Sequence, residues 1–341
     1  MNPLTSTAGG APYQDAAPGS DTSRFRSLTL FLAVFTFLTM AMGPLVRAED
    51  AGLACPDWPL CFGYVLPPAE YRIWLEVGHR YLAMILGFIV LAWSIMIFAR
   101  RDLRSRFAWY AVGVLLLLAL QVFLGRQTVT QKLDPYIVKS HLINALFMFT
   151  VILAVWSRLR LAPDAEAQAK AAGAAPIPGR WFAFALLAFV FMQIYLGGRV
   201  STNYAGMVCD KFPACNEVRV NSAPASDAST QPATRPVYFP PMKGNVEKHM
   251  THRFMAYFLV VLAIALIPLS RRWKWSPGRA KNALVLSMLI FSQVVLGVLN
   301  VLMKLPVVIT VMHSITAIVI YVFAFLLWYE LKPEYGRTAS T

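Results

Sequence analysis

Apolar residues fall into long runs without charge, separated by short polar segments. Eight stretches contain no Asp, Glu, Lys or Arg: 27–46, 81–99, 107–125, 140–157, 181–198, 254–270, 282–303 and 305–329. A helix needs roughly 20 mostly apolar residues to cross about 30 Å of hydrocarbon. The pattern therefore predicts an all-α polytopic membrane protein with eight transmembrane helices.

The charge distribution sets the expected topology. Of 341 residues only 14% are charged and 57% are hydrophobic, whereas soluble domains have about 25% charged residues. We therefore attribute the net charge of +14 to the membrane topology of the chain and not to nucleic-acid binding. Arg and Lys collect in 100–106 and 271–281, which places these loops and both termini in the cytoplasm. The segments 47–72 and 199–253 are then external.

Domain boundaries follow from the same pattern. We expect a disordered cytoplasmic tail at 1–26, an N-terminal four-helix bundle at 27–160 and a cytoplasmic linker at 161–180. A C-terminal four-helix bundle at 181–331 would carry a long external loop at 199–251, and 332–341 would be a second cytoplasmic tail. Ser, Thr and Pro dominate 221–241 within the long loop, which we expect to be mobile.

An internal repeat relates the two halves. Residues 42–61 match 196–215 at a constant offset of 154, and QVFLGRQTV at 121–129 corresponds to QVVLGVLNV at 293–301. Each half has four predicted helices and begins on the cytoplasmic side, so the repeats are parallel. The sequence predicts two pseudo-two-fold-related four-helix bundles, each able to hold a site in its interior.

Four of the five histidines occupy paired positions of this repeat. His79 corresponds to His252 and His141 to His313, one on every second helix. A lone histidine near a helix end is commonly an interfacial or core residue, but ionisable groups at membrane depth are costly and usually functional. Two inward imidazoles in one bundle suit bis-histidine ligation of haem iron. A metal ion such as copper is the alternative, although the pairs lack additional Cys, Met or carboxylate ligands.

Charged neighbours distinguish the two halves. Glu76 lies one turn before His79, where the second half has His249. Glu76 is a candidate catalytic group that moves a proton or stabilises a cation, or else it orients an imidazole. Arg80 and Arg253 follow the first histidine of each half. They are candidate partners of haem propionates, and snorkelling to lipid headgroups is the alternative.

The four cysteines form two pairs with the same spacing. Cys55 and Cys61, like Cys209 and Cys215, are separated by five residues within external segments. The external placement favours a disulfide in each loop. A redox role for one pair is the alternative.

With these residues the sequence resembles the haem A synthase family from about residue 27 to 331. The resemblance rests on the Glu76-x-x-His79-Arg80 motif, His141, His252-Arg253, His313, the GLACPDWPLC loop and the paired QVxLG segments. It implies that haem O, the substrate, binds between His79 and His141, and that a haem b cofactor binds between His252 and His313. The implied reaction oxidises the C8 methyl group of haem O to a formyl group, giving haem A for terminal oxidases. Glu76 would be the residue that directs this oxidation.

The resemblance also implies partners and a location. These are haem O synthase, terminal oxidase assembly proteins, an electron-transfer partner and the lipids of the inner membrane. Nucleic acid is not expected, and a homo-oligomer is left open. Two other functions compete: a dihaem b-type electron carrier and a haem-handling chaperone. A carrier needs histidines near both membrane faces to move electrons across about 30 Å, whereas all four are expected on the outer side here.

Overall fold

The protein is all-helical throughout the part of the chain that the computed structural model describes, which is residues 20–161, 173, 175, 177–209, 212, 213, 215 and 244–333. The long helices are α1 (Ser20–Ala48), α2 (Tyr71–Ala99), α3 (Arg101–Thr130), α4 (Pro135–Arg158), α6 (Arg180–Thr202), α7 (Asn245–Arg272), α8 (Pro277–Leu302) and α9 (Val307–Glu330). A short 3-10 helix, η1, covers Ala205–Met207. Eight helices are long and apolar enough to cross a membrane, which confirms the predicted membrane class.

The helices extend beyond the charge-free stretches. α2 begins at Tyr71 and α7 at Asn245, each about ten residues before the apolar run that identified it. Apolar runs mark the hydrocarbon layer, whereas helical hydrogen bonding continues into the interface. For the same reason α1 begins at Ser20, inside the tail expected to be disordered. Residues 1–19, 221–241, 334–341 and most of 161–180 lie outside the described residues.

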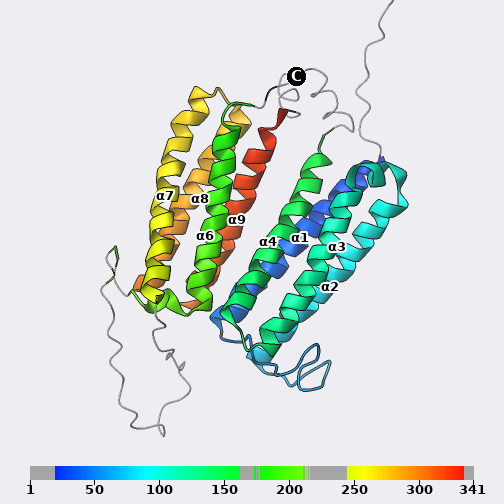
Figure 1. Ribbon diagram of the computed structural model, residues 1–341, viewed down its shortest axis with the longest axis vertical. Helices are drawn as coiled ribbons and strands as arrows, with labels where there is room; N and C mark the ends of the chain where they lie inside the picture. The colour runs from blue at the N-terminus through cyan, green and yellow to red at the C-terminus, as the bar shows by residue number, and fades with distance from the viewer. Residues whose placement is uncertain are drawn as a thin grey trace, which may run out of the picture.

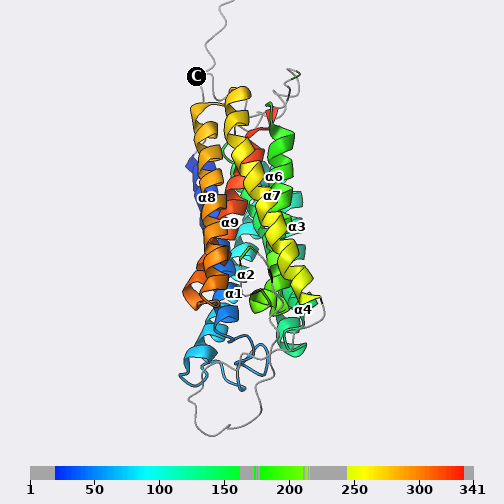
Figure 2. The same cartoon turned by 90° about the vertical axis from the view of Figure 1, so that its left-hand side faces the viewer.

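The eight helices pack as two groups of four. α1 contacts α2 and α4, and α3 contacts the same two helices; α6, α7, α8 and α9 repeat this arrangement. We call α1–α4 the first bundle and α6–α9 the second bundle. They lie side by side (Figures 1 and 2), joined by contacts of α9 with α1 and α4 and of α6 with α4. The pseudo-two-fold relation between the bundles stays a prediction.

The two ends of the molecule differ. The loop 49–70 lies at the same end as the C-terminus of α6 and the N-terminus of α7, at the bottom of Figure 1. We call this the disulfide end. The α2–α3 and α7–α8 connections lie at the opposite, basic end (Figure 1), and they contain the Arg- and Lys-rich segments. The alternation of the eight helices thus places all the cysteine-containing segments away from the basic loops.

Polar contacts join the bundles at two depths. Within the helices, Thr150 Oγ1 of α4 lies 2.7 Å from the Tyr321 hydroxyl of α9. At the disulfide end, Arg47 Nη2 donates to the Ser201 carbonyl over 3.0 Å, and the Arg47 guanidinium stacks 3.8 Å above the Tyr204 ring centroid. The Thr150–Tyr321 contact is partly buried between helices, where a hydrogen bond stabilises helix association. The Arg47 contact is exposed and adds a second attachment between the bundles.

Candidate functional site

A disulfide closes the loop above each bundle, as the external placement of the cysteine pairs predicts. Cys55 is bonded to Cys61 and Cys209 to Cys215, and both Cys55 and Cys61 are buried. The peptide bonds before Pro59 and Pro213, at equivalent positions of the repeat, are both cis. The two loops are therefore built alike.

Equivalent arginines bind these loops from the helix below. Arg80 Nη1 donates to the carbonyls of Asp57 and Leu60 over 2.8 and 2.6 Å. Arg253 donates to the carbonyls of Cys209 and Pro213 over 3.2 and 3.3 Å. The guanidinium groups thus hold the loops in this structure. A contact with haem propionates, expected from the sequence, stays a prediction.

Glu76 and His249 also bind the loop above their own bundle. Glu76 is only 4% exposed. Its Oε2 accepts the Cys55 amide hydrogen over 2.9 Å, and its Oε1 forms an ion pair with Arg80. In the second bundle, His249 Nδ1 lies 2.8 Å from the Ala205 carbonyl oxygen, which can only accept, so the imidazole donates. The unassigned histidine of the sequence is therefore a loop-binding residue, and Glu76 shares this structural role.

The four paired histidines lie at similar depths from the disulfide end. His79, His141, His252 and His313 are six to eight residues beyond the first residue of α2, α4, α7 and α9. At 1.5 Å per residue this is about 9–12 Å of helix. His79 and His252 precede the charge-free runs 81–99 and 254–270. Because α2 and α7 begin before these runs, both histidines still lie inside their helices.

Three of these histidines pack against a repeated sequence pattern on the helix that precedes their own. α3, α6 and α8 carry QVFLG at 121–125, QIYLG at 193–197 and QVVLG at 293–297. A Cβ atom on the glycine would lie 3.1–3.2 Å from Cε1 of the histidine ring: Gly125 against His141, Gly197 against His252 and Gly297 against His313. Ordinary carbon contacts are about 3.5–4.0 Å, so a larger residue at these positions would require the ring to shift by a few tenths of an ångström.

The glutamine one turn earlier binds the histidine residue itself. Gln193 Nε2 donates to the His252 carbonyl over 3.2 Å, and Gln293 Nε2 donates to the His313 carbonyl over 2.9 Å. Gln121 Nε2 lies 3.2 Å from His141 Nε2, and Asn144 donates to Gln121 Oε1 over 2.7 Å. Sequence reasoning missed this role of Gln and Gly, although the recurrence of Q-x-x-L-G in three helices was visible.

α1 departs from the pattern found in α3, α6 and α8. Its corresponding segment, 39–43, reads TMAMG. Thr39 takes the place of glutamine, and its hydroxyl donates to the Phe35 carbonyl of its own helix over 2.9 Å. A Cβ on Gly43 would meet no atom within 4 Å. The first bundle therefore has open space where the second bundle holds a histidine ring against glycine.

The residues present fit haem iron. Among the described residues, Nδ1 of His79, His141, His252 and His313 is buried without a hydrogen-bond partner, which is costly unless a ligand compensates. The His252 and His313 ring centroids are 6.4 Å apart. With metal–imidazole bonds of about 2.0–2.1 Å, two imidazoles on opposite sides of one metal have centroids roughly 6.4 Å apart.

The fold and the site define an all-helical polytopic membrane protein with a half-buried histidine pair and a disulfide-closed loop in each of two bundles. A model of the COX15-CtaA family, described as cytochrome oxidase assembly protein, matches residues 26–325. The chain belongs to this family.

Curated relatives cover most of the chain. A protein of Shewanella oneidensis named Heme A synthase is 30% identical over 313 residues, which span 82% of this chain and 88% of the relative. A protein of Caulobacter vibrioides with the same name is 26% identical, over 89% of this chain and 95% of the relative. The similarity therefore extends through both bundles.

Proposed function

We propose that this protein is a haem A synthase that oxidises the C8 methyl group of haem O to a formyl group, giving haem A for terminal oxidases. The observation that carries the proposal is the set of four half-buried histidines at one end of the molecule, two in each bundle, each with a buried Nδ1 that lacks a hydrogen-bond partner. The names of the curated relatives support it.

The two bundles would bind different haems, one the cofactor and the other the substrate. His252 and His313 would hold a haem b cofactor, which when bound supplies one-electron transfer; their spacing and their glycine contacts support this. His79 and His141 would hold the substrate haem O. The open space beside Gly43 supports a site that admits and releases a ligand.

Glu76 is the proposed acid–base residue of the substrate half. It is the one carboxylate a turn away from His79, it is buried, and the second bundle has a histidine in its place. Conversion of the methyl group to a formyl group takes an oxygen atom from water and releases protons and electrons. The Glu76 carboxylate would take up a proton, and the proposed electron acceptor would take the electrons. The Cys55 amide and Arg80 fix the orientation of that carboxylate.

The proposed location is the inner membrane, with both termini in the cytoplasm and the disulfide end facing outward. The basic segments 100–106 and 271–281 lie at the opposite end from Cys55–Cys61, and basic loops favour the cytoplasmic side. Haem O synthase, oxidase assembly proteins and an electron acceptor are the proposed partners.

Pigment extraction tests the reaction. Membranes that contain haem O and express the wild-type protein should yield haem A, whereas the Glu76→Ala variant should yield none and keep the absorption spectrum of haem b. His249→Ala, at the equivalent position of the second bundle, is the matched control and should still form haem A. Unchanged haem A in the Glu76→Ala variant would contradict the assigned role. Bound haem without any haem A in the wild type would favour the electron carrier or the chaperone.

A further inference from the structure

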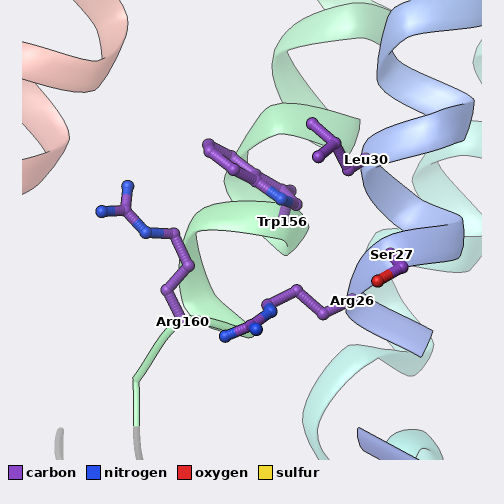
Figure 3. Close-up of a pocket in the computed structure, with 5 residues that line it drawn as sticks. All are labelled: Arg26, Ser27, Leu30, Trp156 and Arg160. Atoms are coloured by element: carbon purple, nitrogen blue, oxygen red, sulfur yellow. The ribbon is translucent and has the colours of Figure 1, made fainter. Parts of the chain in front are cut away.

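An open pocket at the basic end lies between α1 and α4, far from the histidines. Its volume is about 290 Å³, and it is lined by Arg26, Ser27, Leu30, Trp156 and Arg160. Figure 3 shows the α1 side chains facing Trp156 of α4 and Arg160, which lies two residues beyond the end of α4. The pocket is thus basic on one side and apolar on the other.

Its charges do not cancel. Arg160 Nη1 forms an ion pair with Glu330 Oε1 over 3.3 Å, and the guanidinium lies 5.2 Å from the Trp156 ring centroid. Asn282 also donates to Glu330, over 3.5 Å. Arg26 adds a second positive charge to the pocket wall. Among the described residues, one of the two guanidinium groups of the pocket is paired with a carboxylate, which leaves the charge of Arg26 for an anion.

We propose that this pocket binds the phosphate group of an anionic phospholipid in the leaflet at the basic end. Guanidinium groups bind phosphate oxygens in a bidentate manner, and basic pockets between transmembrane helices are typical sites of anionic lipid headgroups. Leu30 and Trp156 give the pocket an apolar wall next to the guanidinium groups. Tryptophan at this level is characteristic of the membrane interface.

The apolar wall favours a lipid over free phosphate. Leu30 is 43% exposed and its helix continues toward the membrane interior, so it could contact the glycerol and acyl portions of a lipid. Free phosphate gains nothing from such a surface. Because Glu330 belongs to α9 of the second bundle, a phosphate beside Arg160 would lie at the boundary between the bundles.

Native mass spectrometry of the purified full-length protein tests this proposal, with phosphatidylglycerol and phosphatidylcholine as probes. Wild-type protein should prefer phosphatidylglycerol. Arg26→Gln and Arg160→Gln should each weaken its binding roughly fivefold, and the double variant roughly 25-fold. Arg101→Gln removes the same charge from an exposed position at the same end and should leave this binding unchanged.

A variant with the opposite expected effect keeps the test independent of folding. Glu330→Gln removes the carboxylate that competes for Arg160 and should strengthen phosphatidylglycerol binding several-fold. Equal lipid binding in the double variant and in Arg101→Gln, or weaker binding in Glu330→Gln, would overturn the proposal. Displacement of the lipid by millimolar inorganic phosphate would overturn the choice of a lipid.

Discussion

Replacing each histidine-facing glycine with alanine tests the geometry of the proposed haem sites. In Gly197→Ala and Gly297→Ala the new methyl group would lie 3.2 and 3.1 Å from Cε1 of His252 and His313. Ordinary carbon contacts begin at about 3.5 Å, so each ring must move by roughly 0.3–0.4 Å. Gly43→Ala adds the same methyl group where no atom lies within 4 Å, so it is the matched control.

The magnitude follows from the cost of overpacking. Extra methyl groups in a packed interior typically cost about 1–3 kcal/mol, which corresponds to roughly 5- to 150-fold in an equilibrium constant. Alanine also stabilises a helix by up to about 1 kcal/mol relative to glycine. That gain applies to all of the variants, so it cancels in the comparison with Gly43→Ala.

Haem b retention is the measured quantity. Transfer of haem from the purified protein to a globin that lacks haem can be followed by absorbance. Gly197→Ala and Gly297→Ala should lose haem b more readily than the wild type, whereas Gly43→Ala should match the wild type. The reasoning would be refuted if the two second-bundle variants retained haem like Gly43→Ala, because the glycine contacts would then have no bearing on the ligand geometry.

Two further predictions concern the contact between Thr150 and Tyr321 and the hydrogen bonds of Asp57. Tyr321→Phe removes the 2.7 Å contact with Thr150 between the bundles and should lower the free energy of unfolding by about 0.6–1.7 kcal/mol. A double-mutant cycle with Thr150→Val, measured by unfolding, should assign this energy to the pair. Additive effects of the two substitutions would contradict the assignment. The amides of Gly63 and Phe62 hold the pKa of Asp57 below its usual 3.8, so this loop contact is complete above pH 3.8 and is lost as the pH falls through the lower folded-state pKa. Amide chemical shifts of Phe62 and Gly63 should change with a midpoint below 3.8 in the wild type and not in Asp57→Asn.

The sequence predicted the membrane class and the disulfides because both depend on local patterns. A charge-free run must be helical in hydrocarbon, where every backbone group needs a partner within its own helix. Helix ends were less predictable: α7 begins at Asn245, among polar residues that carry no apolar signal. The contact of Gly125 with His141 could not be predicted from the sequence, because it depends on which helices pack together. The repeat of Q-x-x-L-G was a sequence signal, but its meaning required the arrangement of the helices.

The departures from the internal repeat lie in two helices of the first bundle, α1 and α2. Thr39 replaces the glutamine of the Q-x-x-L-G pattern, Gly43 has free space beside it, and Glu76 stands where the second bundle has His249. All three positions lie in α1 or α2, on the two helices that would flank a ligand of His79. The second bundle instead holds both of its histidines by the same glutamine and glycine contacts. A permanent cofactor requires fixed ligands, whereas a substrate must enter and leave, so the asymmetry supports the first bundle as the site of the reaction.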